Sequence, residues 1–292
     1  MFLLLAGLNL RAANTPDYSA YIRTQTVSAA DTKLAPSSAL DVTYIANEGF
    51  LIEAAGKKVL IDSLFENGFG LFAQPSAALQ EQMAQARSLF SKVDLILVSH
   101  RHEDHFSAKL VAECLRNNPG CRLIADRQAV DLLRKIEGFS RIQNQVRELT
   151  LPPGRQEHLT VNGIDVTAIG LVHIPMYRDG RNVNEGLSNT GFLVDFGPAR
   201  FFHGGDASLG ENKTNLASIT FTEKPLDVLF VMGALDRSPE TTGLVATRIK
   251  PRNITGMHLR PDQFVEESGR FLKAYPGGVV FHESLERRQY AR

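Results

Sequence analysis

The chain has 292 residues, of which 43% are hydrophobic and 22% charged, a composition typical of a globular protein with a sizeable core. Lysine and arginine balance aspartate and glutamate at 32 each, and the pI is about 7.1, so no overall basic field draws nucleic acid or an anionic membrane. No apolar run approaches the ~20 residues that a membrane-spanning helix needs.

Residues 1–37 are predicted to be a leader or a flexible N-terminal tail. Residues 2–10 form a short apolar run, and Ala12 and Ala13 are small residues suited to a cleavage site. No basic residue precedes the run, so the signal-peptide pattern is incomplete, which a start codon placed too far downstream would explain. We expect a periplasmic or otherwise exported protein, with the cytoplasm as the alternative.

Residues 38–292 are predicted to form one domain that opens with antiparallel strands. Apolar and polar residues alternate there as they do in half-buried strands, and later segments alternate between helical and strand patterns. The first elements are strands at 42–47, 49–54 and 57–62, a helix at 77–90, a strand at 94–98, a helix at 107–118, a strand at 122–126 and a helix at 129–136.

The middle of the chain is rich in predicted strands. A hairpin is expected over 158–172, because Asn162–Gly163 is the strongest short hairpin signal, and another over 190–205. The remaining elements are a strand at 226–233, a helix at 240–250, a strand at 253–258 and a helix at 261–275. With no internal repeat and no low-complexity linker, these elements indicate two sheets packed between helices in a single domain.

Two cysteines, Cys114 and Cys121, flank the end of the predicted helix at 107–118. Their separation does not match a zinc-binding CxxC unit. In an exported protein they could form a disulfide, and in the cytosol they would stay reduced. We expect a pair of half-buried thiols, with the disulfide as the alternative.

The strand at 94–98 is followed by SHRHEDH, which places His100, His102, Asp104 and His105 within six residues. Residues two apart in an extended loop can face the same side, so His100 and His102 can bind one ion, while Asp104 and His105 face another. Imidazoles and carboxylates at this density suit Zn²⁺, with Mn²⁺ or Fe as alternatives. Burying these groups without an ion would be costly. The segment therefore predicts a metal site.

This segment resembles the H-x-H-x-D-H motif of the metallo-β-lactamase superfamily. The resemblance implies an α/β (α+β) fold, a four-layer αββα sandwich, with two divalent metal ions in a cleft at its edge. It also implies three further ligands that each follow a strand, and AIGLVHIP, FFHGGD and NITGMH supply them. The implied ligands are those of a first ion (His100, His102 and His173), those of a second ion (Asp104, His105 and His258) and a bridge (Asp206).

Two ions bridged by a carboxylate can hold a hydroxide between them, because coordination lowers the pKa of water toward ~7. The hydroxide would attack a carbonyl carbon or a phosphorus, and Asp104 would orient it or pass a proton. The resemblance thus implies a metal-dependent hydrolase that cleaves an ester, lactone or phosphodiester of a small or lipid-like substrate. True β-lactamases of this superfamily lack the bridging carboxylate, so Asp206 argues against antibiotic hydrolysis.

Within the superfamily, residues 42–62 and the HGGD segment look most like the group around ascorbate-6-phosphate lactonase and the phospholipase D of N-acyl phosphatidylethanolamine. That group often has polar residues near the site at the positions of Asn47 and Glu48, which otherwise form a plain turn. Two alternative functions remain: a catalytically silent metal-binding or sensing protein, and a metal-dependent nuclease. The complete ligand set argues against the former, and the balanced charge argues against the latter.

The Gly- and Asn-rich segment after His173 should overhang the metal ions. Tyr177, Arg178 and Arg181 in this segment, and Arg260 after the last predicted ligand, are candidates to bind an anionic group of the substrate; a solvated loop is the alternative.

A hydrophobic lip for an acyl or aromatic substrate is predicted at Phe65, Phe69 and Phe72, which otherwise pack within their loop. The other histidines, His158, His203 and His282, are expected at strand edges or on the solvated side. His203 could hydrogen-bond a ligand or be a structural residue. No nucleic-acid partner and no transmembrane segment are expected, and the oligomeric state is left open.

Overall fold

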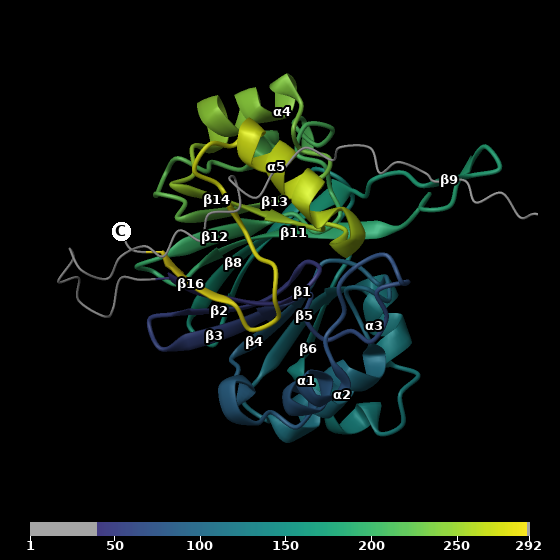
Figure 1. The fold of residues 1–292 in the computed structure, drawn as a ribbon. Helices are drawn as coiled ribbons and strands as arrows, with labels where there is room; N and C mark the ends of the chain where they lie inside the picture. Colours follow the sequence, from purple (N-terminus) through teal and green to yellow (C-terminus); the bar gives the residue numbers. More distant parts are fainter. Residues whose placement is uncertain (1–39, 291–292) are drawn as a thin grey trace, which may run out of the picture.

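The computed structural model describes residues 40–290, so the predicted leader lies outside the described residues. Two seven-stranded sheets face each other, and helices cover their outer sides (Figure 1). This is the predicted αββα sandwich. The first sheet contains, in spatial order, β16 (Arg287–Tyr290), β1 (Leu40–Ala46), β2 (Gly49–Ala54), β3 (Lys57–Ile61), β4 (Leu95–Val98), β5 (Arg122–Asp126) and β6 (Val146–Leu149).

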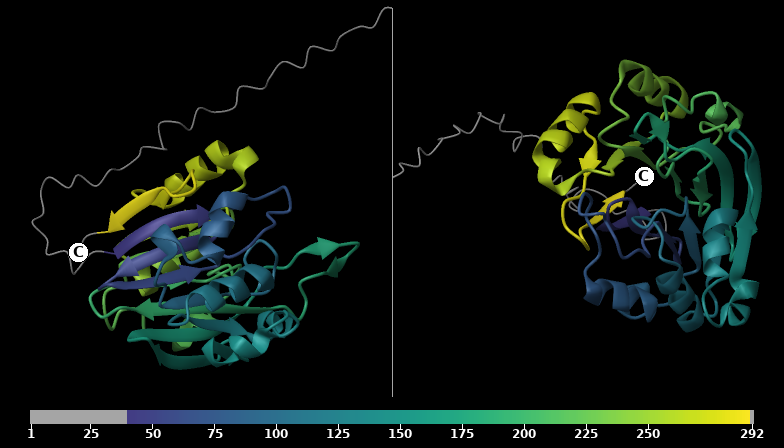
Figure 2. Two further views of the ribbon diagram at one scale, coloured as in Figure 1. Left: turned by 90° about the horizontal axis from the view of Figure 1, so that it is seen from below. Right: turned by 90° about the vertical axis from the view of Figure 1, so that its right-hand side faces the viewer.

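The second sheet mixes antiparallel hairpins with parallel strands. Its spatial order is β15 (Val279–Val280), β14 (Asn253–Met257), β13 (Val228–Met232), β12 (Arg200–His203), β11 (Ser188–Asp195), β8 (Ile164–Val172) and β7 (Gln156–Val161). Both predicted hairpins are confirmed, β7 with β8 and β11 with β12. Asn162 and Gly163 have φ values of +53° and +77°, as a tight hairpin turn requires. A small hairpin of β9 (Tyr177–Arg178) and β10 (Arg181–Asn182) projects from the body (Figure 2).

Helices α1 (Ala77–Ala84), α2 (Ala108–Asn117) and α3 (Arg127–Leu133) cover the first sheet, and α4 (Pro239–Leu244) and α5 (Phe264–Ala274) cover the second (Figure 1). Four begin after a residue whose side chain accepts a hydrogen bond from the first turn, namely Ser76, Ser107, Asp126 and Ser238. Shorter helical turns are Ser88–Phe90, Phe139–Arg141, Gln143–Gln145, Asn215–Ser218, Val245–Ile249 and Pro261–Gln263. None of the described helices has both the length and the apolarity to cross a membrane.

Three predicted boundaries are wrong. The helix expected over 77–90 ends at Ala84, because Ala86 and Ser88 have φ values near +50°, which an α-helix cannot contain. The helix expected over 240–250 is an α-helical turn followed by a wider π-helical one. The helix expected over 129–136 begins earlier, at Arg127, because Asp126 caps it. Strands β6, β9, β10, β15 and β16 were not predicted.

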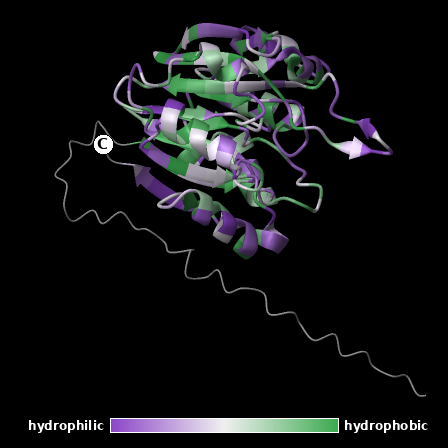
Figure 3. Cartoon of the chain, turned by 90° about the horizontal axis from the view of Figure 1, so that it is seen from above, coloured by the Kyte–Doolittle hydropathy of each residue, from purple (hydrophilic) through white to green (hydrophobic). Residues whose placement is uncertain are grey.

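The core lies between the sheets and beneath the helices. Along β2, Phe50 and Ile52 point into the space between the sheets, while Leu51 points toward the helices, as the two-residue period of a strand requires. The ring of Phe50 lies 4.6 Å from that of Phe230 in the opposite sheet, measured between centroids. In Figure 3 the central strands are mostly hydrophobic, whereas the β9–β10 hairpin is hydrophilic.

The strand directions bring four chain segments to one rim of the sandwich. In the second sheet, β8 is antiparallel to β11 and β11 to β12, so β8 and β12 run the same way, and β13 and β14 are parallel to β12. The residues that follow β8, β12 and β14 therefore meet at the same edge of that sheet. The residues that follow β4 reach this edge from the first sheet.

Replacing Phe50 with alanine should lower the free energy of unfolding by about 3–5 kcal/mol, because Phe50 is fully buried between the sheets and its removal leaves a cavity. Urea unfolding followed by circular dichroism measures this change. As a control, Val265→Ala on α5, where the side chain is 46% exposed, should change it by about 0.5 kcal/mol or less. Equal effects of the two substitutions would contradict the proposed packing.

Candidate metal centre

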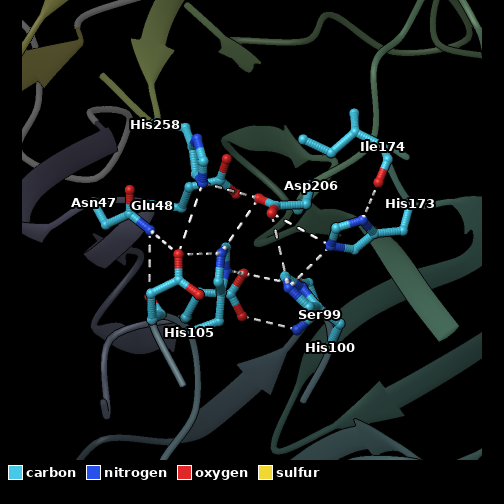
Figure 4. A network of polar contacts seen from close by, with 12 residues as sticks. Asn47, Glu48, Ser99, His100, His105, His173, Ile174, Asp206 and His258 are labelled. Carbon is cyan, nitrogen blue, oxygen red and sulfur yellow. Dashed lines mark hydrogen bonds and ion pairs between the residues drawn. The ribbon is translucent and has the colours of Figure 1, made fainter. Parts of the chain in front are cut away.

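All seven predicted ligands come together at this rim. Figure 4 labels His100, His105, His173, Asp206 and His258 among them. In each of two groups, one ligand atom from every residue lies within 4.8 Å of the others. The first group follows β4, β8 and β12, and the second follows β4 and β14. Their members are His100, His102, His173 and Asp206 in the first group, and Asp104, His105 and His258 in the second.

The carboxylate of Asp206 lies between the two groups. Its Oδ2 atom is 3.4 Å from Nε2 of His173 and 3.9 Å from Nε2 of His100. Its Oδ1 atom is 3.3 Å from Nε2 of His105 and 3.5 Å from Nε2 of His258. Ligands ~2.0–2.1 Å from a tetrahedral Zn²⁺ lie roughly 3.3 Å from each other. The two oxygens thus face the two ligand groups separately, at distances that suit atoms sharing a metal ion.

Asp62 fixes the ring orientation of two histidines. Ser99 donates its hydroxyl proton to Asp62 Oδ2 over 2.6 Å, so the same hydroxyl must accept from Nδ1 of His100, which is 2.9 Å away. His105 donates from Nδ1 to the same Asp62 oxygen over 3.1 Å. Because Nδ1 is the donor in both rings, Nε2 is the atom that each presents to the centre.

His173 is oriented in the same way by the main chain. Its Nδ1 donates to the carbonyl of Ile174 over 2.7 Å, and the amide of Asn184 donates to the same carbonyl over 3.0 Å. Nε2 of His173 then faces Nε2 of His100 at 3.3 Å, although neutral rings carry no proton on either atom. Two lone pairs at this distance repel each other unless a cation lies near both. The donor set therefore fits a metal ion.

Two of the imidazoles and the carboxylate of Asp206 are in the charge states that bind a metal ion. Burial lowers the pKa of His100 well below its usual value and that of His102 to about 4, so both rings are neutral at pH 7. Burial opposes the charged form of His105 as well, but the carboxylates of Asp206 and Asp104 outweigh it and raise its pKa. Burial also opposes the charge of Asp206, yet His258 and His105 hold its pKa well below its usual value.

Asn47 supports Asp104 from the β1–β2 turn. Its side-chain amide donates to Oδ2 of Asp104 over 3.2 Å and to the Asp104 carbonyl over 3.3 Å. Oδ1 of Asp104 is buried without a hydrogen-bond partner in the described chain. His203 is a structural residue rather than a ligand, because Gly205 donates to its Nδ1 and its Nε2 donates to the Glu48 carbonyl.

A cavity of about 860 Å³ opens above the centre. Of the candidate substrate contacts, Arg178 lines it, whereas Tyr177 and Arg181 lie on the projecting hairpin outside its lining. The guanidinium of Arg260 is paired with Asp262 at 2.7 Å. The cavity is lined by Asn67, Phe69, Leu71, Phe72, His102, Asp104, His173, Ile174, Pro175, Met176, Arg178, Val183, Asn184, Asp206 and His258.

Two of the three phenylalanines that were predicted to form a hydrophobic lip lie in the cavity wall. Phe69 and Phe72 line the cavity, and the ring of Phe72 lies 4.0 Å from that of His258. Phe65 is instead fully buried in the protein interior. Phenylalanines of the same loop thus contribute to two different places, the core and the cavity wall.

The remaining histidines and the cysteines lie away from the centre. His158 hydrogen-bonds Thr167 on an exposed strand surface, and the ring of His282 packs on Phe264. Cys114 and Cys121 are buried free thiols, more deeply covered than predicted. Burial raises the pKa of Cys114 to about 12, which leaves it protonated and unreactive.

Three supporting residues were missed in the sequence. Asp62 is the last residue of a predicted strand, and Ser99 precedes the histidine motif, but nothing local indicates that the two touch. Asn184 lies in the loop that was expected to overhang the metal ions. An acidic residue directly after a buried strand was the available signal for Asp62.

An αββα sandwich with this cluster at its rim defines the class of metal-dependent hydrolases with the metallo-β-lactamase fold. Residues 57–272 match the family model described as the beta-lactamase superfamily domain, and the chain belongs to that superfamily. The predicted superfamily and enzyme class are therefore confirmed. The narrower lactonase or phospholipase D group stays a prediction.

Similar curated proteins carry the same class name. The chain is 25% identical over 220 residues to a UPF0173 metal-dependent hydrolase of Thermococcus kodakarensis, an alignment that covers 74% of this chain and 83% of the relative. It is 22% identical over 260 residues to a UPF0173 metal-dependent hydrolase of Pyrococcus furiosus, covering 84% and 98%.

Solved structures share the fold. Igni18, a metallo hydrolase from Ignicoccus hospitalis, matches with a TM-score of 0.54 and 20% identity, covering 87% of this chain and 99% of that one. An isothiocyanate hydrolase from Delia radicum gut bacteria matches with a TM-score of 0.56 and 15% identity, covering 86% and 100%. At these identities the likeness concerns the fold alone.

Replacing Asp62 with asparagine should weaken metal binding about 10–100-fold, because the partner that orients His105 and, through Ser99, His100 is altered. Competition with a chromophoric chelator measures the affinity. Asp94→Asn is the matched control, since Asp94 lies just before the start of β4, away from the ligands that follow its end, and accepts a hydrogen bond from Lys57. Unchanged affinity in Asp62→Asn would show that the network does not orient the ligands.

Proposed function

We propose that the protein is a binuclear hydrolase that holds two divalent ions, Zn²⁺ first and Mn²⁺ or Fe as alternatives, and cleaves an ester, lactone or phosphodiester bond. The observation that carries this proposal is the position of Asp206, whose two oxygens face two separate groups of imidazoles. The relatives named metal-dependent hydrolases support the reaction class.

Two such ions, when bound, supply hydroxide at neutral pH and polarise the bond that is attacked. Asp104 is the chain's own proton-transfer group. Asn47 fixes its Oδ2 atom, while Oδ1 has no hydrogen-bond partner among the described residues, and Asp104 lines the cavity. Asp104 Oδ1 would accept the proton of the attacking water and deliver it to the leaving group.

The cavity wall supports a lipid-like substrate. Its outer part is formed by apolar side chains from two loops, residues 69–72 and residues 174–183. Several of these side chains are about half exposed, so they are free to contact a ligand. Arg178 is the cationic side chain among the described lining residues, and its guanidinium suits a carboxylate or phosphate at the far end of such a substrate. This lining favours a substrate whose acyl chain lies against the apolar wall and whose scissile bond lies over the ions.

Removing a proposed catalytic group should abolish turnover. Asp104→Ala should lower kcat at least roughly hundredfold, the usual contribution of general acid–base catalysis. His258→Ala should leave about one ion per chain, since it removes a ligand of the second position only. Elemental mass spectrometry and hydrolysis of ester, lactone and phosphodiester panels measure both effects. His158→Ala, remote from the centre, is the control.

Fewer than two ions per chain in wild type would contradict the binuclear centre, and turnover that ignores both substitutions would contradict the hydrolase function. In that case a non-catalytic binding role is favoured.

The apolar wall should determine the preference for acyl length. Met176→Gln and Val183→Gln should each lower kcat/KM for a decanoyl ester about tenfold while leaving an acetyl ester nearly unchanged, because each lost methylene contact costs ~0.8 kcal/mol. Steady-state kinetics on an acyl series measures the effect. Leu235→Gln, 49% exposed and outside the cavity lining, is the matched control. Parallel losses for both esters would contradict a role in binding the acyl chain.

A further inference from the structure

Glu48 is a fully buried carboxyl group at the β1–β2 turn, beside the metal centre (Figure 4). Neither of its carboxylate oxygens has a hydrogen-bond partner within residues 40–290. Burying an acidic group without a partner is costly, and proteins normally avoid it unless the group pairs or coordinates a metal. A glutamate at this position therefore indicates that its oxygens bind something other than the described residues.

The side chain of Glu48 faces the second group of ligands. One of its oxygens, a ring nitrogen of His105 and a carboxylate oxygen of Asp206 all lie within 4.8 Å of one another. Nε2 of His105, Oδ1 of Asp206 and Nε2 of His258 are also buried without hydrogen-bond partners in the described chain. These buried atoms without partners gather in one place, around the proposed second ion.

A separate ion on the other side of Glu48 is excluded by the neighbouring bonds. Glu48 also lies within 4.8 Å of ligand atoms from Asp62 and His203. Asp62, however, already accepts from Ser99 and His105, and both ring nitrogens of His203 are hydrogen-bonded. Of that trio only Glu48 has free oxygens. Its coordinating atoms are therefore available to the centre itself.

We propose that Glu48 is an additional carboxylate ligand of the second metal position, beside Asp104, His105, Asp206 and His258. The inference rests on the proposed binuclear function. It makes the two positions chemically different, since the first has three imidazoles and one shared carboxylate, while the second has two imidazoles and three carboxylates. Oxygen-rich sets suit Mn²⁺ or Fe²⁺ better than imidazole-rich sets do. The second position should thus be the one that accepts Mn²⁺ or Fe²⁺.

Metal titrations of the apoprotein test this assignment. Wild type, Glu48→Gln and Glu53→Gln are freed of metal with a chelator and titrated with Mn²⁺, the free ion being counted by electron paramagnetic resonance, and then with Zn²⁺. Glu53→Gln is the matched control, because Glu53 lies on β2, the strand that follows Glu48, and pairs with Lys58 and Arg287 away from the centre. Wild type and Glu53→Gln should bind two ions. Glu48→Gln should bind the first normally and the second Mn²⁺ at least about tenfold more weakly.

Thermal unfolding of the same apoproteins separates ligation from folding. Without metal, Glu48→Gln should unfold at or above the wild-type temperature, because it removes a buried acidic group, and the metal-induced rise in Tm should be smaller than in wild type. An apo Glu48→Gln protein less stable than wild type, or one that binds the second Mn²⁺ as wild type does, overturns the role of Glu48. Wild type that binds fewer than two ions overturns the binuclear function and this role together.

Discussion

The metal centre depends on a close contact between ring nitrogen atoms that cannot hydrogen-bond each other. Nε2 of His100 and Nε2 of His173 lie 3.3 Å apart, each with its lone pair directed inward. This arrangement is unfavourable in the metal-free protein, so the rest of the fold must offset the repulsion between the two nitrogen atoms. A bound cation reverses the sign of the interaction, and its binding energy then adds to the stability of the fold.

The scaffold does this with backbone contacts between the two sheets. Thr190 of the second sheet donates its N–H to the carbonyl of Ser99, which follows β4 of the first, over 2.8 Å. Gly205 approaches the same place with a φ of +56°, and a Cβ there would lie only 2.5 Å from that of Ser99. A residue larger than glycine would force the sheets apart at the point where Asp206 must reach between the two ligand groups. The close approach of main chains thus sets the position of the bridge.

The sequence was sufficient to predict which seven side chains come together, because four stand in one motif and the resemblance to the superfamily indicated the other three, each after a predicted strand. Asp62 was not recognisable, since its contact with His105 spans 43 residues and exists only because β3 and β4 pair in parallel, with Ile61 opposite Leu97. For the same reason β16 was missed: four residues, two of them arginines, form a strand only because β1 offers an edge to pair with. Phe65 and Phe69 lie in one loop without a repeating pattern, so their different fates, core and cavity wall, depend on tertiary packing alone.

The two sides of the centre differ in charge and in access. His102, His173, Asp104 and His258 line the cavity, whereas His100, His105 and Glu48 lie beneath them, closed to solvent. In the proposed centre, the carboxylates of Asp104, Asp206 and Glu48 balance three of the four positive charges of two divalent ions. One positive charge remains, and a ligand can approach it only from the cavity. A hydroxide or the developing negative oxygen of a substrate therefore completes the charge balance, while a neutral acyl chain can rest on the apolar wall without disturbing it.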